Sequence, residues 1–123
     1  TTDIISVHTP LNDETRNIVN SKVLNLMTPG SYVVNTARGG LVNVEDALAA
    51  LNSGQLGGLA LDVLPNEPPG DHPLVKHSRT ILTPHAAFYS QEAEIELRSK
   101  AAQNIITFAR TGRPDYIVTK GTR

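Results

Sequence analysis

The chain has 123 residues, 39% of them hydrophobic and 19% charged, which fits one soluble globular domain. Its net charge of −1 offers no basic surface for nucleic acid or anionic lipid, so we expect neither as a partner. No apolar run approaches the roughly 20 residues of a membrane span, and the lack of cysteine excludes disulfides, thiolate metal sites and a cysteine nucleophile.

The first half of the chain alternates short β-branched runs with amphipathic stretches, the pattern of an α/β domain with a parallel sheet. We predict strands over residues 4–7 and 32–36. A short helix is expected after the N-cap Asn20, and a longer one between the N-cap Asn43 and Gly54.

The second half continues this alternation. Strands are predicted over residues 59–63 and 80–83, and a long helix from about 91 to 111 after the N-cap Ser90. The loop 65–78 between the two strands is rich in proline, which predicts no regular structure there. One side of the long helix is apolar, and we expect it to lie against a core. That side comprises Ala93, Leu97, Ala101, Ile105 and Phe108.

Polar side chains gather where the predicted strands end, the edge at which open parallel sheets bind ligands. They are His8 and Thr9, then Asn35, Thr36 and Arg38, then Asp62, and finally His85, with Glu67 in the long loop. No G-x-G-x-x-G phosphate cradle, metal-ligand spacing or G-x-S-x-G nucleophile elbow is present.

Each candidate has a structural interpretation beside a functional one. Arg38 is either a solvated loop arginine or a planar fork for a carboxylate, and the small residues beside it favour the second. His85 is either a core or cap residue, or an acid–base group whose tautomer Glu67 fixes. Asp62 ends an apolar strand and needs donors, either from backbone N–H groups or from a ligand.

Four motifs occur in order along the chain. They are Val7-His8-Thr9-Pro10-Leu11 with Glu14-Thr15-Arg16, Asn35-Thr36-Ala37-Arg38-Gly39-Gly40-Leu41-Val42, Leu61-Asp62-Val63 with Glu67-Pro68, and Leu82-Thr83-Pro84-His85-Ala86-Ala87. Together they closely resemble the NAD-dependent D-isomer-specific 2-hydroxyacid dehydrogenases, over residues 4 to 114. Residues 85–90 and 111–115 are most similar to the branch with the C-terminal-binding-protein co-repressors and phosphoglycerate dehydrogenase-like enzymes.

The resemblance implies a partial Rossmann-like, doubly wound parallel sheet of about four strands with a long C-terminal crossover helix. Residues 1–112 would be the second half of an NAD-binding domain with its crossover helix, and 113–123 a tail returning toward a substrate domain. The family's glycine fingerprint would precede Thr1, and the chain opens without Met. We therefore expect it to be part of a longer protein and inactive alone.

The resemblance also implies hydride transfer between NAD(H) and a 2-hydroxy or 2-oxo acid, D-specific, with NADP not excluded and no metal. Arg38 would hold the substrate carboxylate, His85 would exchange the hydroxyl proton, and Glu67 would hydrogen-bond to His85. Asp62 would bind the nicotinamide end, and Phe88 would border the substrate together with Arg38. The full set expected at the cofactor is Thr9, Pro10, Thr15, Thr36, Ala37, Arg38, Asp62, His85 and Ala87.

Two departures and two alternatives accompany this interpretation. Asn43 stands where many relatives have Asp, an exchange of one helix cap for another. Glu67 in place of Gln argues against the formate-oxidising members. The alternatives are an NAD(H)-sensing dimerisation module of the co-repressor type, and an inactive fragment. A cytoplasmic homodimer is expected for the full-length protein.

Overall fold

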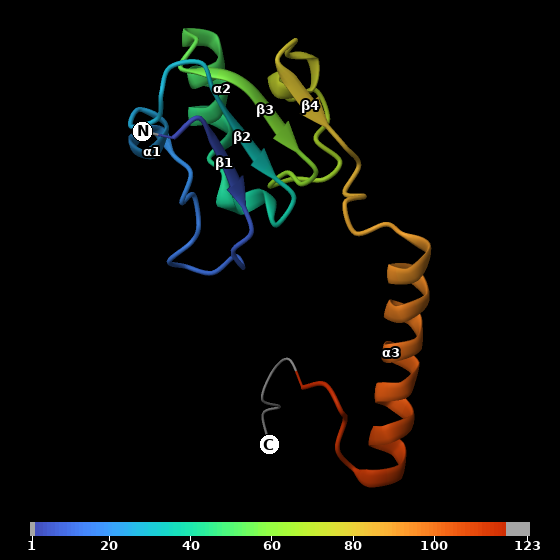
Figure 1. Ribbon diagram of the computed structural model, residues 1–123. Helices are drawn as coiled ribbons and strands as arrows, with labels where there is room; N and C mark the ends of the chain where they lie inside the picture. The colour runs from blue at the N-terminus through green and yellow to red at the C-terminus, as the bar shows by residue number, and fades with distance from the viewer. Residues whose placement is uncertain (1, 118–123) are drawn as a thin grey trace. The chain divides into compact units, whose positions relative to one another are not determined.

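The computed structural model describes residues 2–117 and divides into two compact units, one ending at Ala87 and one beginning at Phe88. Within the described part of the first unit lie the strands β1 (Ile4–Val7), β2 (Ser31–Asn35), β3 (Leu56–Leu61) and β4 (Thr80–Leu82). All neighbours pair in parallel, in the order β1-β2-β3-β4 (Figure 1). The prediction of an α/β domain with a parallel sheet is therefore confirmed.

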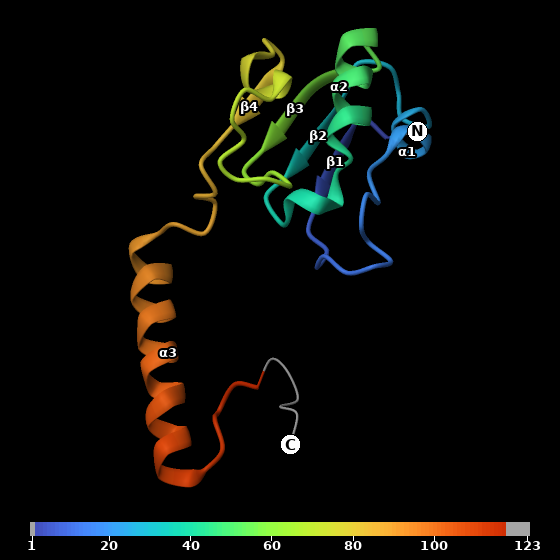
Figure 2. The same cartoon turned by 180° about the vertical axis from the view of Figure 1, so that it is seen from behind.

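The connections between the strands carry the helices α1 (Ser21–Leu24) and α2 (Val44–Ser53) and the 3-10 turns η1 (Gly39–Leu41) and η2 (Pro73–Lys76). Asn20 and Asn43 cap the two helices by accepting backbone N–H bonds, as predicted. Gly54 ends α2 with a φ of 83°, a conformation that glycine adopts without strain. Seen from behind, α2 lies across one face of the sheet (Figure 2).

The core fills the space between α2 and this face of the sheet. It includes Leu24, Val33, Leu51, Leu56 and Leu59, each at most 2% exposed. On the other face, the alternate residues Ile4, Tyr32 and Ile81 are between 52% and 68% exposed.

Two details differ from the sequence prediction. β3 spans Leu56–Leu61 rather than residues 59–63. It starts earlier because Gly57 and Gly58 belong to it, although glycine is rare in strands, and it ends before Asp62. A Cβ on Gly57 would lie 2.3 Å from the carbonyl oxygen of Gly30, so only glycine fits. The expectation of no regular structure in the loop is wrong, since Pro73 begins η2, where its missing N–H is not needed.

The second unit contains the helix α3 (Gln91–Thr111), which Ser90 caps and Gly112 ends, as predicted. The Asn104 side chain accepts from the Tyr116 backbone N–H at 2.9 Å and donates to its carbonyl at 3.1 Å. This pair of bonds ties the segment after the helix to the helix itself.

The helix α3 has no buried residue, and the core contact expected for its apolar side stays a prediction. The predicted division at residue 112 also stays a prediction, and residues 118–123 of the expected tail lie outside the described residues. No helix in the described chain is long and apolar enough to cross a membrane.

Candidate active site

Asn35 shapes the turn that presents Arg38 at the end of β2. Its side chain is fully buried, donates to the Arg38 carbonyl at 2.9 Å and accepts from the Ala37 N–H at 3.0 Å. Arg38 itself is exposed, and its Nη1 donates to the Ala37 carbonyl at 2.7 Å. The guanidinium therefore lies at the edge of the sheet, on a turn whose backbone is held by the Asn35 side chain.

Asp62 follows β3 directly and organises the turn after β4. Although only 5% exposed, it accepts from the Thr83 hydroxyl and the Ala86 N–H through Oδ1, and from the Ala87 N–H through Oδ2. A buried carboxylate needs such donors, because losing water without replacing its hydrogen bonds is costly. Of the two sources of donors expected for Asp62, backbone N–H groups are therefore present.

Glu67 and His85 form a hydrogen-bonded pair across the ends of β3 and β4. Glu67 Oε2 lies 2.9 Å from His85 Nδ1, and Glu67 Oε1 accepts from the Leu64 N–H at 2.8 Å. Because the carboxylate can only accept, Nδ1 carries the proton of this bond. The arrangement fixes the imidazole tautomer and directs Nε2 away from Glu67.

The electrostatics of the two carboxyl groups favour their charged forms. Burial raises the pKa of Asp62, but the hydrogen bonds from Thr83, Ala87 and Ala86 outweigh it, so the pKa lies below its ordinary value. The Leu64 N–H and the His85 imidazole together lower the pKa of Glu67. Both groups are therefore carboxylates at neutral pH.

We predict that the free energy of unfolding decreases at acidic pH, in part because Asp62 becomes protonated. Its folded-state pKa is depressed, so the stabilisation is full above the unfolded pKa of about 3.9 and is lost as the pH falls through the folded value. Urea unfolding of the complete protein between about pH 7 and pH 3 should show a shallower fall for Asp62→Asn. Asp71→Asn is the control, since the Asp71 side chain is 97% exposed. Equal slopes for Asp62→Asn and the parent protein would contradict the assignment.

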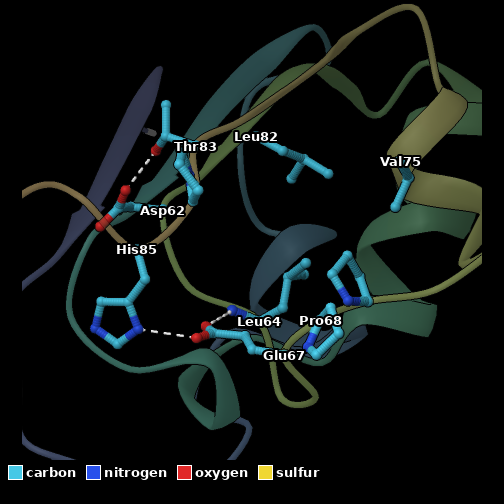
Figure 3. Close-up of a pocket in the computed structure, with 10 residues that line it drawn as sticks. Asp62, Leu64, Glu67, Pro68, Val75, Leu82, Thr83 and His85 are labelled. Atoms are coloured by element: carbon cyan, nitrogen blue, oxygen red, sulfur yellow. Dashed lines mark hydrogen bonds and ion pairs between the residues drawn. The ribbon is translucent and has the colours of Figure 1, made fainter.

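Two cavities adjoin the Glu67–His85 pair, which lines both of them. One, of about 320 Å³, is polar where Arg16 and Arg38 line it. The other, of about 410 Å³, is bordered by apolar side chains such as Leu64, Val75 and Leu82 (Figure 3). The structure thus brings Arg38, Glu67 and His85 around one cavity, as the sequence predicted for a common site.

Gly39 joins the two loops that carry Arg38 and Glu67. A Cβ at this position would lie 2.0 Å from the carbonyl carbon of Leu64 and 2.4 Å from the nitrogen of Pro65. The space that a side chain at Gly39 would need is thus occupied by backbone, while the glycine itself lines the cavity of Arg38.

Gly39→Ala should therefore destabilise the protein by about 3 kcal/mol, because two backbone segments must separate to admit the methyl group. Gly40→Ala is the matched control: its Cβ would meet the flexible Leu11 side chain at 3.0 Å, and we expect a loss below about 1 kcal/mol. Urea denaturation measures both. Equal losses in the two variants would contradict this account of Gly39.

The remaining predicted site residues are spread around the same edge of the sheet. Thr9 and Pro10 follow β1, while Thr36 and Ala37 follow β2. The Thr15 hydroxyl donates to the Pro10 carbonyl at 2.7 Å and accepts from the Asn12 N–H at 2.8 Å, so it holds its own loop. Phe88 belongs to the second unit, and its place beside a substrate stays a prediction.

Some residues that build the site were not assigned to it from the sequence. Asn35 supports Arg38, the Leu64 N–H holds Glu67, and Thr83 bonds to Asp62. Arg16 lines the cavity of Arg38. Asn35, Arg16 and Thr83 carried a signal, because they are polar residues within the quoted motifs, whereas Leu64 carried none.

The arrangement can bind an anion and move a proton within one cavity. Arg38 offers a planar set of donors for a carboxylate, and a histidine paired with a carboxylate is a competent acid–base group. No group of three or more acidic, histidine or cysteine side chains suited to a metal is found in residues 2–117. Proton transfer next to a bound carboxylate is therefore the chemistry that these residues supply.

Comparison with known proteins agrees with this chemistry. Residues 1–87 match the family described as D-isomer specific 2-hydroxyacid dehydrogenase, NAD binding domain. A glyoxylate reductase of Thermofilum pendens is 40% identical over 119 residues, which are 96% of this chain and 35% of that protein. The chain thus spans about a third of this relative.

Two solved structures have the same fold. A D-isomer specific 2-hydroxyacid dehydrogenase from Lactobacillus delbrueckii ssp. bulgaricus, in its NAD-complexed form, gives a TM-score of 0.84 at 34% identity, over 95% of this chain and 40% of that one. An NADPH-dependent glyoxylate/hydroxypyruvate reductase from Sinorhizobium meliloti, in complex with NADP and malonate, gives 0.89 at 28% identity, over 95% and 37%. The sheet is therefore Rossmann-like.

Proposed function

Because the chain belongs to the D-isomer-specific 2-hydroxyacid dehydrogenase family, we propose that its protein interconverts a 2-oxo acid and a D-2-hydroxy acid with NAD(H). The observation that carries the proposal is the convergence of Arg38, Glu67 and His85 on one cavity at the ends of the parallel strands. Such a cavity offers the carboxylate binding and the proton transfer that this reaction requires.

In the direction of reduction, Arg38 binds the substrate carboxylate and polarises the 2-oxo group. His85, doubly protonated and held by Glu67 at Nδ1, delivers its Nε2 proton to the carbonyl oxygen as C2 becomes tetrahedral. The Glu67 carboxylate stabilises the imidazolium before the transfer and fixes the neutral ring after it. The reverse reaction returns the hydroxyl proton to Nε2.

The residues present fit the nicotinamide end of a dinucleotide. The side chains of Thr36 and Ala37, after β2, are small and leave space for the nicotinamide ring. Asp62 Oδ2 accepts one hydrogen bond from the described residues, which leaves an acceptor position for a carboxamide N–H. Bound NAD(H) supplies the hydride. We assign Thr9, Pro10, Thr15, Thr36, Ala37, Arg38, Asp62, His85 and Ala87 to this cofactor, and Phe88 with Arg38 to the substrate.

The test is steady-state oxidation of NADH and NADPH by the complete protein against a panel of 2-oxo acids that includes glyoxylate and hydroxypyruvate. We expect turnover, with chiral products of D configuration. Self-association that depends on NADH, with no turnover of any acid, would instead favour a dinucleotide-sensing module. Turnover yielding L products would also contradict the proposal.

We further propose that the complete protein is a cytoplasmic homodimer. The support for both statements is the resemblance to the family. Light scattering on the purified protein gives the oligomeric state, and a monomer at the concentration of the enzyme assay would overturn it. Fractionation of cells tests the compartment.

A further inference from the structure

The turn that carries His85 has a backbone conformation that few residues adopt. His85 has a φ of 53°, in the left-handed region, where a non-glycine residue persists only if its surroundings hold it. Its N–H donates to the carbonyls of Asp62 and Thr83, each at 2.9 Å. The orientation of the imidazole therefore depends on whatever fixes residues 83 to 87 against the end of β3.

The Asp62 carboxylate holds the turn of residues 83 to 87 through hydrogen bonds to its backbone. It binds the N–H groups of Ala86 and Ala87, the two residues after His85, each at 2.9 Å. The Thr83 hydroxyl donates to Oδ1, the oxygen that also accepts from Ala86. Among residues 2–117, Thr83 thus contributes the only side-chain donor found for this carboxylate, and the two N–H groups complete the set.

Two hydrogen-bonded pairs of side chains hold the turn of residues 83 to 87 at different positions. One joins Thr83 to Asp62, and the other joins His85 to Glu67 (Figure 3). Without the hydroxyl, a 5%-exposed carboxylate loses one of three donors, and an under-satisfied buried acceptor is expensive. The Asp62 carboxylate would then regain a hydrogen bond by shifting toward water. The N–H groups of Ala86 and Ala87 must move with it or lose their hydrogen bonds to it.

We propose that Thr83 is a positioning residue, whose hydroxyl acts through Asp62 to hold His85 in line with Glu67 for proton transfer. The catalytic consequence rests on the proposed dehydrogenase function, whereas the geometric consequence does not. A purely structural role for Thr83 predicts lower stability alone, with the folded variant keeping the His85–Glu67 bond.

The experiment compares three substitutions in the complete protein. Thr83→Val removes the hydroxyl at nearly constant shape, and Thr83→Ser retains it. Thr80→Val is the matched control: the Thr80 hydroxyl is buried in β4, and the structure gives it no partner among the described residues. Far-UV circular dichroism establishes that each variant is folded, and Thr83→Ala replaces Thr83→Val if the latter fails to fold.

The first readout is nuclear magnetic resonance, which needs no turnover. Thr83→Val should speed the exchange of the Ala86 and Ala87 amide protons by about tenfold, and broaden the downfield Nδ1–H resonance of His85. Thr83→Ser and Thr80→Val should keep both features of the parent protein. Parent-like exchange and an unchanged Nδ1–H resonance in folded Thr83→Val would overturn the proposal, whatever the enzyme assay shows.

The second readout is the split between kcat and KM for the 2-oxo acid. We expect Thr83→Val to lower kcat by about tenfold with the substrate KM within about twofold, and Thr83→Ser to restore most of the loss. Equal losses in Thr83→Val and Thr83→Ser would overturn the role of the hydroxyl. Absence of turnover in the parent protein would contradict the proposed function, and the resonance data would still decide the role of Thr83.

Discussion

Arg38→Lys should lower kcat/KM for a 2-oxo acid by about a hundredfold or more. Lysine keeps the charge but is a single point donor, whereas a guanidinium can bind the carboxylate with two parallel bonds and still polarise the neighbouring carbonyl. The fold should not change, because the Arg38 side chain is exposed and the turn beneath it is held by the backbone bonds to Asn35.

The matched control for Arg38→Lys is Arg16→Lys. Arg16 lines the same cavity, so the control changes the same residue type in the same surroundings. We expect Arg16→Lys to stay within about threefold of the parent protein. An Arg38→Lys variant with parent-like kcat/KM would remove Arg38 from the reaction. Equal losses in both variants would show that the effect is not specific to the position of Arg38.

His85→Gln should have the largest effect, a loss of about a thousandfold in kcat. The glutamine amide can occupy similar space, but it cannot deliver a proton to the developing alkoxide. His8→Gln serves as the control, since His8 stands at the same sheet edge after β1 and its Nε2 lies 2.7 Å from the Ser6 hydroxyl. A large loss in the control, or none in His85→Gln, would contradict the assignment of the acid–base group.

The main features of the site follow from the sequence because they depend on strand ends and residue types. Asn35 ends β2, Asp62 follows β3, and His85 lies shortly after β4. Because these strands are parallel, their carboxyl ends meet at one edge of the sheet. Glu67 was placed near His85 on the strength of chemistry and resemblance, and the structure puts the two 2.9 Å apart. The roles given to these residues remain proposals for the assays above.

Contacts between backbone segments that are distant along the chain could not be predicted from the sequence. The need for Gly39 arises from the backbone at Leu64 and Pro65, and the need for Gly57 from the carbonyl of Gly30. No local pattern encodes either approach. The same holds for Thr83, whose partner Asp62 is 21 residues earlier in the chain.

The early start of β3 illustrates a related limit. Propensity disfavours Gly57 and Gly58 in a strand, but the carbonyl of Gly30 leaves no room for a Cβ at Gly57, and the Tyr32 ring lies close to Gly58. Tertiary packing therefore overrides the local preference. In η2 the proline that predicted a break occupies the one position of a helical turn that tolerates it.

We propose that Glu67 acts through His85, so that the pair is a single proton-transfer unit beside Arg38. The most direct test is a double-mutant cycle in the complete protein, measuring the single-turnover rate of NADH oxidation by a 2-oxo acid in Glu67→Gln, His85→Gln and the double variant. We predict that Glu67→Gln slows the parent protein by about tenfold or more and has almost no further effect once His85 is replaced. Independent, multiplicative losses in the double variant would contradict the claim.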